Sequence, residues 1–316
     1  MLIGSILFFV VGLQDRNFFL IATKPDNVPI AGMLLLVGFF TWLAFRRAVI
    51  NDDLRDRGEP NLEERASRQK VFTWPDLVYS ELIALMVTGA ILVVWSIYLK
   101  APIEEPAAPA LSPNPAKAPW YFLGLQEMLV YFDPWLAGVV FPSMIIVGLQ
   151  ALPYIDRNPK GNGYYTFKER PFAIAVFMFG FMILWISLVV LGTFLRGPNW
   201  SFFGPFDYWD HSKLEPLINV DLSELFWVYM LGQPLPDFWL VREFPGILLI
   251  VLYLGFLPIL LAKTWFKKMF IEIGFARYMV MIQLFLFMAL LPIKMILRWT
   301  FNLKYLVHIN EFFLNI

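Results

Sequence analysis

The chain has 316 residues, of which 59% are hydrophobic, 18% aromatic and 16% charged, and its mean hydropathy is +0.63. Soluble globular domains are about half apolar and about a quarter charged, so both departures indicate an integral membrane protein. The 25 basic and 25 acidic residues give a formal net charge of zero, which argues against nucleic-acid binding.

The chain contains no cysteine and only two histidines, His211 and His308. The lack of cysteine excludes disulfides, iron–sulfur clusters, thiolate–metal sites and covalent c-type heme attachment through this chain. A b-type heme between transmembrane helices needs paired axial ligands, usually histidines, at membrane depth. Both histidines lie outside the predicted spans, so we expect the chain to bind no heme or other metal through its own side chains.

Hydropathy predicts about six transmembrane helices. Five segments are long and apolar enough to cross roughly 30 Å of hydrocarbon, and a sixth is interrupted by Pro292 and Lys294 but still reads as a span. The predicted spans are 30–45, 77–99, 135–152, 172–195, 246–262 and 278–297. Residues 1–13 are apolar but too short for a crossing, and no small-residue cleavage site follows them. We therefore expect an interfacial or re-entrant segment there, not a cleaved signal peptide, in an all-α integral membrane protein.

The basic residues predict the orientation. Three connections between spans, 46–75, 156–170 and 263–277, hold 15 of the 25 basic residues. They alternate along the chain so that all three share one face, which the positive-inside rule assigns to the cytoplasm. Both termini are then expected outside. The outer face also receives a proline-rich loop at 100–118, an apolar stretch at 119–133 and a long loop at 196–245.

The stretch 119–133 reads PWYFLGLQEMLVYFD and is too short to span the bilayer. We expect an amphipathic helix in the outer interface, with Trp120 and Tyr121 in the headgroup belt. The preceding loop has six prolines between 101 and 119, which favour a stiff, extended connection over a helix.

The loop 196–245 is rich in Trp, Phe, Asp and Pro and has no long apolar run. A loop this long and this aromatic favours a structured contact surface over disorder. We expect a packed periplasmic cap with one short helix near 222–231.

Two carboxylates are candidates for chemistry, because an ionisable group near the membrane interior is costly to bury. Glu81 lies one turn into the second span, where a snorkelling or packing role fits equally well. Glu127 falls seven residues after Trp120, close to two helical turns, so the two should share a helix face. A carboxylate there could accept a proton from a quinol or similar ligand; the alternative is an ordinary solvated interfacial glutamate.

Four sequence motifs occur in the order found in a known family. They are FTWPDL at 72–77, APIEEP at 101–106 with NP at 114–115, PWYFL at 119–123, and FKERPFA at 167–173. Together they resemble the C-terminal part of cytochrome b, and especially subunit IV of the cytochrome b6f complex, over roughly residues 71–195. The family motifs are a WPNDLL-type helix start, a GEPADP or PANP loop, PEWYF, and FRRPVA.

The resemblance implies a heme-free subunit of a bacterial quinol:cytochrome c oxidoreductase in the inner membrane, acting as part of a complex and not as an enzyme alone. It implies one wall of the quinol oxidation site on the positive side of the membrane. Residues expected to contact the quinol are Pro119, Trp120, Tyr121, Phe122 and Leu123. Implied partners are a cytochrome b6-like subunit with the b hemes, a Rieske protein with its 2Fe-2S cluster, and a c-type cytochrome. The quinol type stays open, with menaquinol as one candidate.

The sequence departs from the family at its catalytic motif. Pro119 stands where the PEWY motif has the glutamate that takes a proton from the quinol, so the sequence reads APWY. Either the site has lost its activity or another carboxylate substitutes for that glutamate. Glu127 is the main candidate, with Glu104 and Glu105 after it.

The chain is also larger than subunit IV, with one span before the three resembling helices and two after them. We predict an N-terminal extension at 1–70, a cytochrome b C-terminal region at 71–195, and a cap with two further helices at 196–316. A second hypothesis is a non-catalytic membrane anchor of another respiratory complex, which the proline in APWY favours. A solute transporter is disfavoured, because we find no convincing internal repeat and few midplane ionisable residues.

Overall fold

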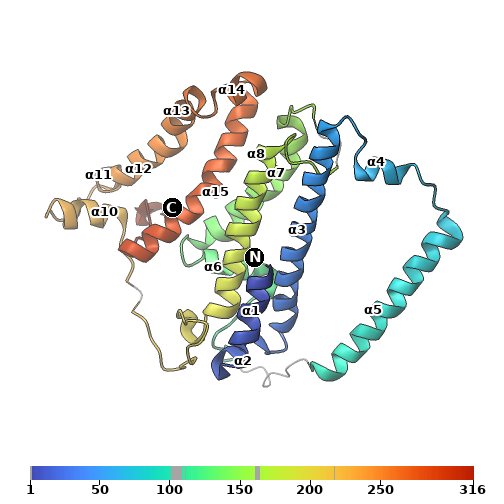
Figure 1. Ribbon diagram of the computed structural model, residues 1–316. Coiled ribbons are helices and arrows are strands. Elements are labelled where there is room, and N and C mark those ends of the chain that lie inside the picture. Colours follow the sequence, from blue (N-terminus) through green and yellow to red (C-terminus); the bar gives the residue numbers. More distant parts are fainter. Residues whose placement is uncertain (1, 101–108, 111, 161–163, 217) are drawn as a thin grey trace. The chain divides into compact units, whose positions relative to one another are not determined.

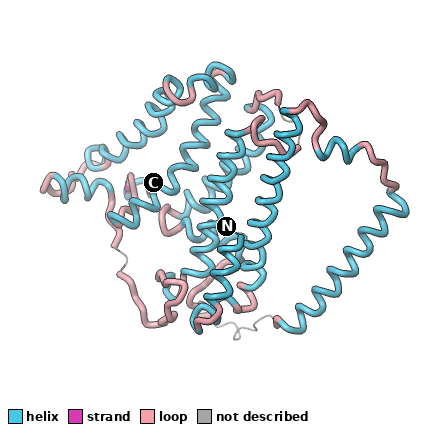
Figure 2. The backbone as a smooth tube through the Cα atoms, viewed as in Figure 1, coloured by secondary structure: helices cyan, strands magenta, loops and turns pink. Residues whose placement is uncertain are grey.

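The computed structural model describes residues 2–100, 109–110, 112–160, 164–216 and 218–316. Within these ranges the chain is mainly helical (Figures 1 and 2). Its regular strands there are β1 (His308–Ile309) and β2 (Leu314–Asn315), which pair antiparallel.

Six helical segments among the described residues are long and apolar enough to cross a membrane, and each overlaps one predicted span (Figure 1). They are α3 (Val28–Asp56), η1–α5 (Thr73–Leu77, Val78–Tyr98), η2–α7 (Leu136–Val140, Phe141–Ile155), α8–η3–α9–η4 (Pro171–Phe177, Met178–Trp185, Ile186–Val190, Leu191–Leu195), α12–η7–α13 (Phe244–Val251, Leu252–Phe256, Leu257–Lys263) and α15 (Phe275–Phe301). The prediction of an all-α, multi-pass membrane protein is confirmed. Pro292 and Lys294 do not break α15.

Shorter elements lie between these spans. They are α1 (Leu2–Gly12), α2 (Arg16–Ala22), α4 (Leu62–Ser67), α6 (Trp120–Met128), η5 (Pro198–Trp200), α10 (Leu222–Glu224), η6 (Leu225–Met230), α11 (Trp239–Arg242), α14 (Lys267–Ile273) and η8 (Asn310–Phe312). The short helix expected near 222–231 is therefore present as α10 and η6.

The chain divides into two compact units. Unit 1 comprises Met1–Ala116, Lys160–Val176 and Thr193–Lys213, and unit 2 comprises Lys117–Pro159, Phe177–Gly192 and Leu214–Ile316. Each unit combines segments far apart in sequence. The three regions predicted from the sequence are drawn around the segment that resembles a known family, whereas these two units are defined by contacts within the structure. The two divisions describe different properties, so the three regions stay a prediction.

The first helices of unit 1 form a bent pair. The axes of α1 and α2 differ by 116°, and neither helix alone is long enough to cross the bilayer. Asp15 begins α2 by accepting hydrogen bonds from the backbone N–H groups of Asn17 (2.9 Å) and Phe18 (3.0 Å). This geometry is that of a broken span or a re-entrant loop, in line with the interfacial or re-entrant segment expected for residues 1–13.

Helix α3 extends beyond the span that hydropathy predicts, because its polar last turns pack on the connection 164–170 of the same unit. The buried Asp52 carboxylate accepts the backbone N–H groups of Phe167 and Lys168, both at 3.1 Å. Arg55 forms an ion pair with Glu169. Two of the three basic connections therefore lie side by side.

The third basic connection belongs to unit 2. There the Arg277 guanidinium donates from Nε to the Tyr154 carbonyl oxygen at 2.9 Å, so the connection 263–277 reaches the end of α7. Within each unit, these contacts agree with the alternating topology predicted from charge.

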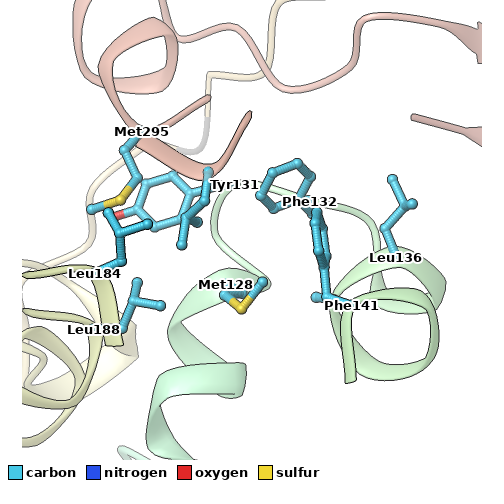
Figure 3. Packing of buried hydrophobic residues seen from close by; sticks show 10 residues of the cluster. Met128, Tyr131, Phe132, Leu136, Phe141, Leu184, Leu188 and Met295 are labelled. Atoms are coloured by element: carbon cyan, nitrogen blue, oxygen red, sulfur yellow. The ribbon is translucent and has the colours of Figure 1, made fainter. Parts of the chain in front are cut away.

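One of the two buried hydrophobic clusters of unit 2 lies where α6 meets the spans (Figure 3). Its buried side chains come from α6 and the turn after it, from η2 and α7, from η3 and α9, and from α15. They are Met128, Tyr131, Phe132, Leu136, Ala137, Phe141, Leu184, Leu188, Leu291 and Met295. The Phe132 and Phe141 rings meet edge to face with centroids 4.8 Å apart. This core fixes the side of α6 that faces the protein.

Candidate functional site

Helix α6 carries the residues predicted to form the quinol site. It begins at Trp120, directly after Pro119 in an extended conformation, and the Ala118 N–H donates to Gln126 Oε1 at 2.8 Å. The helix ends at Met128, which is earlier than the expected end near 133. Residues 129–132 instead form a tighter turn that leads the chain, through Pro134, toward η2.

The first turn of α6 and the rest of the helix differ sharply in exposure. Trp120, Tyr121 and Phe122 are 42%, 52% and 51% exposed, whereas Leu123 is buried. The first turn thus presents three aromatic side chains outward. The predicted contact residues are contiguous in sequence, but the structure separates them into an exposed aromatic group and a buried anchor.

Glycines allow the buried side of α6 to pack closely on the fourth span. A Cβ atom at Gly192 would lie 3.2 Å from the Leu123 carbonyl oxygen, and one at Gly124 would lie 3.2 Å from the Trp185 ring. The backbones of α6 and the segment around α9 therefore approach more closely than larger residues would permit.

Glu127 lies in the covered part of α6, one residue before the helix ends. Its side chain is fully buried, and Oε1 accepts a hydrogen bond from the hydroxyl of Tyr131, also fully buried, at 2.9 Å. The seven-residue spacing does place Trp120 and Glu127 at the same angular position, but only Glu127 is covered by neighbouring elements. Glu127 is therefore not the solvated interfacial glutamate that the sequence left open.

The segment after α15, residues 302–316, covers the turn that follows α6. Lys304 Nζ donates to the carbonyl oxygens of Leu129 at 2.7 Å, Val130 at 3.2 Å and Phe132 at 3.4 Å. Helix C-terminal carbonyls lack partners within the helix, and a lysine there satisfies them. The connection joins residues more than 170 positions apart.

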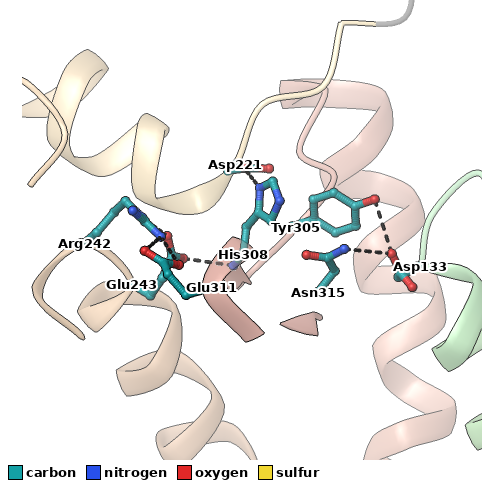
Figure 4. A network of polar contacts seen from close by, with 8 residues as sticks. All are labelled: Asp133, Asp221, Arg242, Glu243, Tyr305, His308, Glu311 and Asn315. Carbon is teal, nitrogen blue, oxygen red and sulfur yellow. Dashed lines mark hydrogen bonds and ion pairs between the residues drawn. The ribbon is translucent and has the colours of Figure 1, made fainter. Parts of the chain in front are cut away.

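The same segment takes part in a polar network within unit 2 (Figure 4). Asp133 accepts from Asn315 Nδ2 at 3.0 Å and lies 3.5 Å from the Tyr305 hydroxyl. His308 Nδ1 lies 2.5 Å from an Asp221 carboxylate oxygen, and its backbone N–H donates to Glu243 at 3.0 Å.

Arg242 joins Glu243 of this network to a further carboxylate, that of Glu311. Arg242 donates to Glu243 Oε1 at 3.1 Å and pairs with Glu311 at 3.0 Å. The pKa of Glu311 is lowered by a backbone hydrogen bond and by its Arg242 partner. The turn after α6, the loop before α10 and the start of α12 are thus all tied to residues 302–316.

The titration of Lys304 should make stability depend on pH. Burial, reinforced by the nearby Arg298 guanidinium, lowers the pKa of Lys304 from 10.5 to about 8. Between these values the unfolded chain binds the additional proton, so the free energy of unfolding should rise with pH, by at most about 3 kcal/mol. We expect the melting temperature of wild type, measured relative to Lys304→Met, to increase from pH 7.5 to pH 10. A constant difference would contradict this assignment.

The other candidates from the sequence are placed elsewhere. Glu81 is exposed on α5, and His211 and His308 both lie outside the six spans. Glu104 and Glu105 fall outside the described residues. Sequence reasoning missed Tyr131, although its position four residues after Glu127 on a helical segment was a usable signal. It also missed Lys304, for which no local signal exists.

Comparison with known proteins identifies part of the chain. Residues 106–205 match the family model described as cytochrome b (C-terminal)/b6/petD. The match includes α6, the third and fourth spans and the start of the outer loop, whereas residues 71–105 of the predicted resemblance lie outside it. No solved structure matches the chain. The segment 106–205 is therefore similar to the cytochrome b C-terminal/b6/petD family, and the chain is a multi-pass membrane protein that carries this segment.

Proposed function

We propose that the chain is a heme-free membrane subunit of a bacterial cytochrome bc-type quinol:cytochrome c oxidoreductase. In this proposal it lies in the inner membrane with its termini in the periplasm and forms one wall of the quinol oxidation site. The observation that carries the proposal is the exposed aromatic first turn of α6 inside the family-matched segment. The partners are a cytochrome b6-like diheme subunit, a Rieske protein and a c-type cytochrome.

The aromatic residues supply the binding surface. Trp120, Tyr121 and Phe122 offer flat, apolar faces to a quinol ring, and Pro119 stiffens the backbone just before them. Leu123 is buried, so it contributes by holding this surface against the rest of unit 2. Ligand sites in proteins are mostly apolar with few polar groups, which fits this arrangement.

Proton transfer is assigned to Glu127. Oxidation of a quinol to a quinone releases two electrons and two protons. Electrons pass to the Rieske cluster and a b heme of the partners, because this chain has no cysteine and no histidine in its spans to hold them. Glu127 accepts one proton, and the other is released to the aqueous phase on the outer side of the membrane. The Tyr131 hydroxyl holds the Glu127 carboxylate in place. Because Glu127 is buried, the ligand's hydroxyl must reach behind the aromatic turn to meet it.

The test is a comparison of quinol kinetics in the purified complex. Trp120→Ala should raise the KM for quinol in quinol-dependent cytochrome c reduction, whereas Trp265→Ala, which removes an exposed tryptophan in the basic connection 263–277, should not. The alternative function is a non-catalytic anchor in another respiratory complex, which Pro119 at the glutamate position favours. If the chain is such an anchor, the KM for quinol should be unchanged in both variants. The proposal would also be rejected if the purified complex contained no b hemes.

A further inference from the structure

We infer that residues 302–316 position helix α6, and that Lys304 is the positioning residue that carries most of this effect. The inference rests on the proposed function in one respect, namely that α6 forms the wall of the quinol site. The structural part stands on contacts within unit 2 alone.

Lys304 completes the hydrogen bonding of the turn after α6. The backbone N–H groups of residues 129–132 bond back to carbonyls of residues 126–128, which leaves the carbonyls of Leu129, Val130 and Phe132 beyond the helix. Lys304 Nζ donates to all three. One side chain therefore provides the hydrogen-bond donor for three acceptors that the helix itself cannot satisfy.

Lys304 is itself supported by helix α15. Lys294 of α15 is fully buried, and its Nζ donates to the Lys304 carbonyl oxygen at 2.5 Å. The same ammonium lies 5.6 Å from the centre of the Phe132 ring. The backbone of Lys304 is thus fixed by α15 while its side chain fixes the end of α6.

A second attachment joins residues 302–316 to the segment that follows α6. The Trp135 indole N–H donates to the Asn315 carbonyl oxygen at 2.8 Å, and the Asn315 amide donates to Asp133. Residues 302–316 therefore hold the α6 turn near each of their two ends, at Lys304 and at Asn315. Two separate attachments restrict rotation of the turn as well as its translation.

Residues 302–316 are themselves held by other elements of unit 2. Lys304 and Leu222 donate backbone N–H groups to Val220 and Tyr305, both at 2.9 Å, and β1 pairs with β2. The Leu306 carbonyl packs directly on the Gly246 backbone at the start of α12. A segment tied to two other elements can act as a fixed frame for the α6 end.

The experiment measures amide hydrogen exchange by mass spectrometry in the assembled complex, together with quinol kinetics. Lys304→Met removes the donor and keeps most of the apolar stem. Lys268→Met, an exposed lysine of α14, is the matched control. We expect exchange in peptides from 120–132 to rise about tenfold or more in Lys304→Met, with a raised KM for quinol. Exchange in α14 and α7 should stay unchanged, and Lys304→Arg, which keeps donors, should restore most of the protection.

The possible results distinguish the positioning of α6 from a general folding role and from the assignment of α6 to the quinol site. Unchanged exchange in 120–132 would overturn the inference, and so would an equal rise throughout unit 2, which would indicate a general folding role. A rise confined to 120–132 with an unchanged KM would uphold the positioning of α6 but reject α6 as a quinol wall. If the Lys304→Met complex does not assemble, Asn315→Ala takes its place in the experiment. We then expect a smaller increase in amide exchange in the same peptides, and an unchanged exchange rate there would overturn the inference.

Discussion

Replacing Glu127 with Gln should lower the turnover number of quinol-dependent cytochrome c reduction by about a hundredfold, the lower range for loss of a general base. Glutamine has nearly the same volume, and its amide oxygen can still accept the Tyr131 hydroxyl. The fold should therefore persist, and the loss should appear in kcat more than in the KM for quinol. The measurement is steady-state kinetics of the purified complex with its heme content matched to wild type.

Two controls separate proton transfer from structural effects. Glu81→Gln changes an exposed carboxylate of α5 and should leave turnover unchanged. Tyr131→Phe removes the hydroxyl next to Glu127 without removing the carboxylate, so it should lower turnover less than Glu127→Gln does. Near-normal turnover in Glu127→Gln would show that the proton goes elsewhere and that this position is structural.

Gly246→Ala should destabilise unit 2 strongly, independently of any function. A Cβ atom at Gly246 would lie only 1.9 Å from the Leu306 carbonyl oxygen and 2.8 Å from Val307 Cγ2. The nearest obstacle is backbone, which cannot rotate away as a flexible side chain can. We expect overpacking to cost about 1–3 kcal/mol or more and to displace residues 302–316 from α12. A lower melting temperature and faster amide exchange in 303–316 would both report this.

Gly255→Ala is the matched control within the same span. No atom lies within 4 Å of the position that its Cβ would take. Alanine favours a helix over glycine by up to about 1 kcal/mol, so this variant should melt at or slightly above the wild-type temperature. If Gly246→Ala melts no lower than Gly255→Ala, the close packing of α12 on Leu306 is not maintained in solution.

The spans could be predicted from sequence because hydropathy is a local property. Each bilayer crossing needs a continuous apolar run, so composition alone locates it. The length of α3 could not be predicted in this way. Its last turns are polar, and they stay helical because Asn51 and Asp52 bond to residues on the connection 164–170, more than 100 positions away.

The site was predictable only in part, for a similar reason. The position of α6 followed from the PWYFL motif, and periodicity correctly put Trp120 and Glu127 at one angle. Periodicity does not say what covers that angle, so the burial of Glu127 depended on packing that the sequence does not display. Lys304 is the clearest case, since nothing in the sequence around this lysine indicates that it reaches the turn after α6.

The bond between Lys304 and Leu129 has a consequence for synthesis. The two residues are 175 positions apart, so α6 leaves the ribosome long before the residue that satisfies its last carbonyls. Four further spans must enter the membrane in that interval. Chains grow from the N-terminus at about 5–20 residues per second, so this turn waits roughly ten seconds or more for its partner. The proposed quinol helix is therefore among the first parts of unit 2 to be made and among the last to be completed.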